Sequence, residues 1–111
     1  MYQTLAYRHR FFAVLIVTGS VRVRPEQLQR ALDLSLEHVR RSRTEPGCLL
    51  HSVHQDAEDP RRLVFLEHWA DASALRAHFD VPTSGAFVTE LADLTDEPPE
   101  MQIYEAHTTF V

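Results

Sequence analysis

The stretch of residues 45–87 constrains the fold of this chain more than any other part of the sequence. It opens with the turn sequence Glu-Pro-Gly-Cys at 45–48, and the run that continues to residue 55 is rich in Leu and Val. After the polar residues 56–60, a second run at 62–69 is rich in apolar and aromatic side chains and ends on a tryptophan. Runs of this kind favour strands, so two of them joined by a polar connection predict an antiparallel hairpin.

Helix signals follow the hairpin. Asp71 is a good N-cap for a helix that we expect to end near Phe79, and Pro82 breaks that helix. Thr83 or Ser84 is expected to cap a further helix, because apolar residues then recur at helical spacing. These apolar positions are Phe87, Leu91 and Leu94.

The N-terminal half of the chain supplies a strand and a longer helix. Residues 12–23 are rich in Val, Ile and Leu and suit a buried strand, in which Gly19 indicates a bulge or a close approach to the backbone. Pro25 fits the first turn of a helix, where its missing N–H costs nothing. The residues that share the apolar arc of this helix are Leu28, Ala31, Leu32, Ser35 and Val39. We expect Leu34 to point outward.

The order of the predicted elements specifies a fold class. A last strand at 101–111 follows a linker that contains two prolines. The resulting order, β-α-β-β-α(α)-β, is a ferredoxin-like α+β arrangement with one antiparallel sheet and helices on one face. We interpret residues 1–11 as an N-terminal extension and residues 12–111 as a single domain, because 111 residues are too few to build two good cores.

Two of the predicted strands are apolar on both faces. Leu63 and Phe65 point one way while Val64 and Leu66 point the other, and residues 14–17 alternate in the same manner. Helices can cover only one face of the sheet, and a sheet with a solvated face normally carries polar residues there. We therefore expect a homodimer that is closed through the second face.

Composition excludes several partners and compartments. The net charge is −5 and no basic stripe is present, so we expect no nucleic-acid partner. No segment approaches the roughly 20 apolar residues of a membrane span. Arg8 and Arg10 precede the apolar run 11–17, as in a signal peptide, but cleavage there would remove the first strand. The single cysteine, Cys48, forms no internal disulfide, and we expect a cytoplasmic protein.

The chain carries seven histidines and no asparagine, yet it lacks a recognisable cofactor motif. His51 and His54 are three residues apart on one strand, so they point to opposite faces and cannot chelate one ion together. No glycine-rich phosphate loop or dinucleotide-binding fingerprint occurs. We therefore expect neither a bound metal nor an organic cofactor, although a two-histidine, one-carboxylate site built from distant positions stays open.

His78 is the first candidate for chemistry. It shares a helix face with Leu75 and Phe79, so we expect it to face the sheet, either as a core histidine or as a base. His51 is the second candidate, because its strand can point it into the same space. The histidines that we interpret as surface or packing residues are His9, His38, His54, His68 and His107.

The hairpin also offers aromatic candidates. Phe65, Glu67 and Trp69 share one strand face by alternation. Trp69 is either a core anchor or one wall of a ligand cavity. Glu67 is expected to be structural and to bond backbone amides near the helix, since a half-buried carboxylate needs such partners. Cys48 is expected to be a small buried hydrophobe.

From about Val14 onward, the chain resembles the antibiotic biosynthesis monooxygenase family, which consists of small dimeric α+β barrel proteins. The residues that carry the resemblance are Glu45, Pro46, Gly47 and Cys48, the pair Glu67 and Trp69, and Ala74, Leu75, Ala77 and His78. Members of this family oxygenate quinols and anthrones with O2, without metal or flavin. The resemblance implies a small aromatic substrate, and His78 or His51 as the catalytic base. The pocket residues that it implies are Trp69, Phe65, Phe87 and Phe79.

Two departures from the family pattern bear on activity. The oxygenases often use a pocket asparagine, which this chain lacks. The haem-degrading branch takes its axial histidine from the helix after the break, where this chain has Thr83, Ser84 and Phe87. Haem degradation is therefore disfavoured. The alternative to a cofactor-independent monooxygenase is a non-catalytic small-molecule-binding or structural protein of the same fold.

Overall fold

The computed structural model describes residues 13–111, so the predicted extension at 1–11 lies outside the described residues. The elements follow the predicted order. They are β1 (Val14–Arg22), the short 3-10 helix η1 (Pro25–Gln27), α2 (Leu28–Ser42), β2 (Cys48–Gln55), β3 (Arg62–Trp69), α3 (Ala72–Asp80), α4 (Pro82–Ala92) and β4 (Glu100–Ala106).

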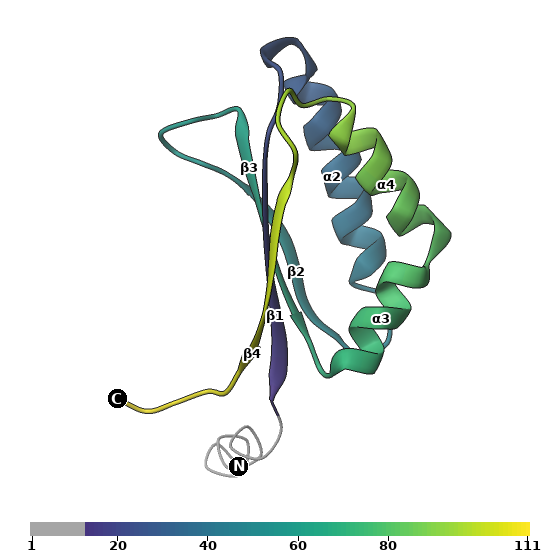
Figure 1. Ribbon diagram of the computed structural model, residues 1–111, viewed down its shortest axis with the longest axis vertical. Coiled ribbons are helices and arrows are strands. Elements are labelled where there is room, and N and C mark those ends of the chain that lie inside the picture. Colours follow the sequence, from purple (N-terminus) through teal and green to yellow (C-terminus); the bar gives the residue numbers. More distant parts are fainter. Residues whose placement is uncertain (1–12) are drawn as a thin grey trace.

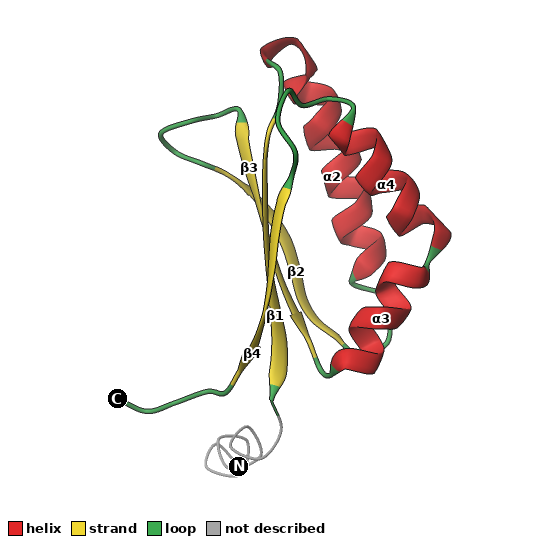
Figure 2. Ribbon diagram, in the orientation of Figure 1, coloured by secondary structure: helices red, strands yellow, loops and turns green. Residues whose placement is uncertain are grey.

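The strands form one antiparallel sheet in the order β2-β3-β1-β4. Figure 1 shows that α2, α3 and α4 all lie on the same side of this sheet, and Figure 2 separates the helical layer from the strand layer by colour. α2 packs against β2 and α4, and α3 packs against β3 and α4. The predicted ferredoxin-like α+β fold is therefore confirmed. Between residues 13 and 111, no helix is long and apolar enough to cross a membrane.

Alternation along β3 decides which side chains enter the interface between sheet and helices. Leu63, Phe65, Glu67 and Trp69 all point toward the helices and are buried. The residues between them are only partly buried, because no helix within the described range covers the second face. The two-faced alternation predicted for this strand is thus present.

Most of the apolar residues gather at the end of the interface where β3 begins. We call this set the apolar core, and its buried members are Val21, Val23, Ala31, Val39, Leu63, Phe65, Phe87 and Leu91. A smaller apolar set, Val17, Trp69 and Leu75, lies where β3 ends. The polar residues described below occupy the space between these two sets.

Three local predictions are wrong. Leu34 is half-buried and packs against the apolar core, because α4 covers its side of α2. At Gly19 the bulge alternative is wrong, because β1 pairs with both neighbouring strands without a shift, and the register shift lies instead between Cys48 and Leu50 in β2. The other alternative, an approach to the backbone, is met by the Glu100 carbonyl oxygen, 3.5 Å from the position of a Cβ. α4 begins at Pro82 without a side-chain cap, so neither Thr83 nor Ser84 caps it, since proline already suits the first helical turn.

Candidate functional site

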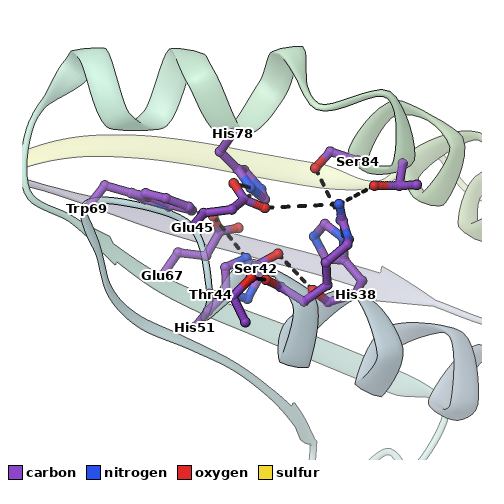
Figure 3. A network of polar contacts seen from close by, with 11 residues as sticks. His38, Ser42, Thr44, Glu45, His51, Glu67, Trp69, His78 and Ser84 are labelled. Atoms are coloured by element: carbon purple, nitrogen blue, oxygen red, sulfur yellow. Dashed lines mark hydrogen bonds and ion pairs between the residues drawn. The ribbon is translucent and has the colours of Figure 1, made fainter.

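Three imidazoles meet between the sheet and the helices. His38 comes from α2, His51 from β2 and His78 from α3, and one ring nitrogen of each lies within 4.8 Å of those of the other two. Their exposed fractions are only 7%, 2% and 3%, respectively. We call these three residues the histidine cluster, and Figure 3 shows them with their polar neighbours.

Glu67 on β3 lies beside two of these rings. Its Oε1 accepts a hydrogen bond from Trp69 Nε1 at 2.8 Å, and it lies 3.3 Å from His51 Nε2 and 3.9 Å from His78 Nε2. Burial alone raises the pKa of Glu67, but His51, the Trp69 indole and His78 outweigh it, so the pKa lies below its ordinary value. The expected partners were backbone amides. The partners found are an indole and two imidazoles, because alternation turns Glu67 into the interface.

A second carboxylate reaches His78 from the turn before β2. Glu45 Oε1 lies 2.9 Å from His78 Nδ1, and a proton on Nδ1 makes this contact a hydrogen bond to the carboxylate. The turn can approach α3 closely because Gly47 has a φ of 81° and no side chain. A Cβ at this position would lie 2.5 Å from the Cβ of Ala74. The turn sequence thus holds Glu45 against His78.

Arg41 closes the cluster on the side of α4. Its Nη2 lies 2.7 Å from His38 Nδ1 and donates to Ser84 Oγ at 3.2 Å. A guanidinium can only donate, so His38 Nδ1 is the acceptor. Burial, followed by the charges of His51, His78 and Arg41, lowers the pKa of His38 to about 3. The His38 imidazole is therefore neutral at pH 7.

Three of the four predicted pocket residues pack within the interior. Phe87 stacks on His38 with 3.9 Å between ring centroids and 5° between ring planes. Trp69 lies 4.6 Å from the His78 ring, and Phe65 meets Phe87 edge to face at 5.9 Å. These aromatic side chains therefore support the imidazoles, and they fill the space that the sequence suggested as a substrate pocket.

Phe79, the fourth predicted pocket residue, lies at the edge of this interior. Its side chain is 44% exposed, and its ring centroid lies 5.8 Å from that of His78. Residue 79 is turned by about 100° around the helix axis from residue 78. The sheet covers the side of α3 that carries Leu75 and His78, so Phe79 faces largely outward.

Within the described residues, three surface hollows border the polar residues; one of about 360 Å³ lies beside β2 and includes His51 in its wall, and the other two differ in size. The larger, of about 370 Å³, lies between the turn and α3, and Glu45, Ala74 and Ala77 are part of its wall. The smaller, of about 140 Å³, lies between α2 and α4 and is bordered by His38 and Phe87. The larger hollow has the volume of a small-molecule site. Because Glu45 lines it and also contacts His78, this carboxylate links the hollow to the histidine cluster.

The structure brings the two predicted catalytic residues together. The ring centroids of His51 and His78 are 5.5 Å apart. His38, interpreted as a surface or packing residue, does pack on a neighbouring ring, but it is buried and belongs to the same cluster. Helical periodicity predicts that His38 faces the interior. It follows Ala31 by seven residues and Ser35 by three, so it lies on the same side of the helix as those two residues.

Comparison with known proteins supports the fold independently of the geometry described above. The family model described as antibiotic biosynthesis monooxygenase matches residues 14–90, a range that includes the whole histidine cluster. An uncharacterized protein of Synechocystis sp., sll1783, is 33% identical over 95 residues. That alignment covers 86% of this chain and 65% of the relative, so the chain spans just under two thirds of the relative's length.

Solved structures agree with the fold. A conserved protein from Methanosarcina mazei Go1 is 28% identical, with a TM-score of 0.79 over 88% of this chain and 96% of that chain. A crystal structure of an antibiotic biosynthesis monooxygenase is also 28% identical, with a TM-score of 0.78 over 85% of this chain and 99% of that chain. The similarity therefore extends over nearly the whole described chain.

Proposed function

Because this chain belongs to the antibiotic biosynthesis monooxygenase family, we propose that it oxygenates an electron-rich aromatic compound, a quinol or an anthrone, with O2. In this reaction one oxygen atom enters the substrate and the other leaves as water. The substrate itself provides both electrons and both protons, so no nicotinamide or flavin is needed. The tasks left to the protein are to accept a proton, to orient the substrate and to limit water.

The contact between Glu45 and His78 carries this proposal. A carboxylate on one ring nitrogen fixes the orientation and the tautomer of an imidazole, and so directs the lone pair to the other nitrogen, as a general base requires. The hollow beside Glu45 gives an aromatic substrate a place to dock next to this pair. Loss of the phenolic or anthrone proton produces an anion that can transfer an electron to O2. His51 is the second candidate base, because it contacts Glu67 within the same interior.

The test is oxygen consumption with a panel of hydroquinones and anthrones, measured with and without a chelator. His78→Ala is expected to lower kcat about 100-fold or more, the size typical of losing general acid–base catalysis. Glu45→Gln is expected to lower it in the same direction. His54→Ala is the matched control, since His54 is exposed on the opposite side of β2 from His51. Activity of His78→Ala within a few-fold of the wild type would contradict a base at this position.

A non-catalytic small-molecule-binding role is the second candidate. It is favoured by the packing of Trp69, Phe65 and Phe87 against the imidazoles and against one another, which leaves the hollows at the surface. Under this alternative, compounds of the same panel raise the melting temperature of the protein but cause no oxygen uptake. Uptake that depends on His78 would exclude it.

We also propose that two copies of the chain pair through the second face of the sheet. Val64 and Leu66 on β3 and Ile16 on β1 point to this face. Tyr104 on β4 is the partner of Ile16 in the pairing register and is 47% exposed. An apolar face of this kind favours association, and a two-fold axis would place the same residues opposite each other.

A further inference from the structure

The histidine cluster has the geometry of a metal site. An ion bound there would occupy ring nitrogens of both candidate bases, so the proposed oxygenation would belong to the metal-free protein. The centroids of the three imidazole rings are 5.2, 5.4 and 5.5 Å apart, so the rings form a nearly equilateral triangle. They come from three different elements, and the fold therefore fixes their relative positions. Neutral imidazole is a common ligand for zinc, iron and other first-row metal ions.

His51 is the member of the cluster that most needs a partner. Within residues 13–111, neither of its ring nitrogens has a hydrogen-bond partner, although the side chain is only 2% exposed. Glu67 Oε1 lies 3.3 Å from His51 Nε2, which is close enough for attraction but is not aligned as a hydrogen bond. A buried polar group without a partner is destabilising, because it has lost its hydrogen bonds to water. A metal ion that binds the lone pair of this ring would satisfy one of its two nitrogens.

Two carboxylates complete the surroundings of such an ion. Glu67 Oε1 lies within 4 Å of His51 Nε2 and of His78 Nε2, at 3.3 and 3.9 Å, and can serve as a fourth ligand. Glu45 bonds the other nitrogen of His78, in the way that an outer carboxylate orients a metal-binding histidine. The hydrogen bond from Trp69 Nε1 in turn orients Glu67.

We propose that His38, His51 and His78, with Glu67 as the fourth ligand, bind one divalent metal ion of the zinc and iron(II) class. Three histidines and one carboxylate around a tetrahedral ion are a donor set that such metals accept. At metal–nitrogen distances of about 2.1 Å, the nitrogens of a tetrahedral site lie about 3.4 Å apart. The cluster must therefore contract, and the unbonded His51 ring can move without losing a hydrogen bond.

Arg41 is one charge that opposes this ion. Its guanidinium contacts His38 Nδ1, so a metal ion bound at that nitrogen displaces it. Arg41 retains other partners in that case, because it also contacts Thr83, Ser84 and Glu45. A second guanidinium, that of Arg43, donates to the backbone carbonyl of His51 at 2.9 Å, so two carboxylates face two guanidinium groups and it is the donor atoms that favour a dication. The smaller hollow between α2 and α4 borders His38 and provides a route for entry.

The test uses untagged protein, because a histidine tag would bind the same metals. The protein is stripped with a chelator and titrated with CoCl2, whose visible absorption reports coordination, and zinc-loaded protein is desalted for elemental analysis. We expect one ion per chain with micromolar affinity or tighter. No substrate or oxygen is present, so a failure of the proposed oxygenation leaves this result unaffected.

Matched histidine variants separate a built site from surface binding. His51→Gln is expected to weaken binding about 100-fold or more, since loss of even an outer partner of a metal ligand costs 10–100-fold. His54→Gln, which changes an exposed histidine on the other side of β2, is expected to bind like the wild type. If circular dichroism shows that His51→Gln does not fold, His38→Gln takes its place. Wild-type protein without stoichiometric metal, or equal binding by the His51 and His54 variants, would overturn the proposal.

Discussion

The apolar core and the histidine cluster lie in the same interface, yet they are built from opposite kinds of side chain. A single strand serves both, because β3 sends Leu63 and Phe65 into the core and Glu67 and Trp69 into the polar region. All four residues are buried. The two regions therefore differ in chemistry and hardly at all in burial.

This difference separates stability from function within one small fold. Burying apolar surface contributes about 25 cal/mol per Å², whereas buried imidazoles and carboxylates cost free energy unless they are bonded. The polar region bears that cost most visibly at His51, which has no hydrogen-bond partner in the described part of the chain. We interpret the apolar core as the source of stability and the histidine cluster as a region retained for chemistry.

The largest effect is expected in the apolar core. Leu63 is fully buried, so Leu63→Ala should lower the free energy of unfolding by about 2–5 kcal/mol, through lost burial and the cavity that remains. Val64→Ala, on the other face of the same strand, should cost less in the monomer because Val64 is only partly buried. Urea denaturation of both variants measures the difference. Equal losses of unfolding free energy in the two variants would show that the two faces of β3 contribute equally to stability, and would contradict this prediction.

A smaller effect is expected at the turn that holds Glu45. Gly47→Ala places a methyl group against Ala74 at a positive φ, so we expect a loss of about 1–3 kcal/mol in unfolding free energy. Gly85→Ala is the control, because a Cβ at this position on α4 meets nothing within 4 Å. That variant should gain up to about 1 kcal/mol in helix propensity. A stable Gly47→Ala protein would contradict the close approach of turn and helix.

A third prediction concerns the second face of the sheet. Leu66→Asp places a charge on the proposed dimer interface and should weaken association at least 10-fold, which corresponds to about 1.4 kcal/mol. Leu36→Asp is the control, because Leu36 lies on α2, outside the sheet. Light scattering across a dilution series measures both. A well-folded monomer of the unmodified protein at micromolar concentration would contradict the dimer.

The fold followed from local sequence patterns. Period-two alternation and turn chemistry are encoded in neighbouring residues, so the bounds of β2 and β3 and the cap at Asp71 match those predicted. The family resemblance of the turn at residues 45–48 and of Glu67 and Trp69 is confirmed by the family model that matches residues 14–90. The errors at Leu34 and Gly19 arose because tertiary packing and strand register decide those positions.

The candidate site was only partly predictable. His51 and His78 could be placed on inward faces from alternation and helical spacing. Their partners could not, because Glu45 and Arg41 reach the cluster through a turn and through the packing of α2 on α4. His38 could have been found from its place on the apolar arc of α2. The chain has six other histidines, so a histidine on this helix did not by itself indicate a site.

The most direct test of the central claim is the free energy of unfolding of the double variant His51→Leu/Glu67→Gln, measured in chelator beside the wild type and Leu63→Ala. The first change fills a similar volume and removes a buried polar group that lacks a hydrogen-bond partner, and the second removes the carboxylate charge that the loss of His51 would leave uncompensated. The account predicts a stability within about 1 kcal/mol of the wild type, or higher. A loss of about 2–5 kcal/mol, the size expected for a buried core residue, would contradict the division between a stabilising core and a functional cluster.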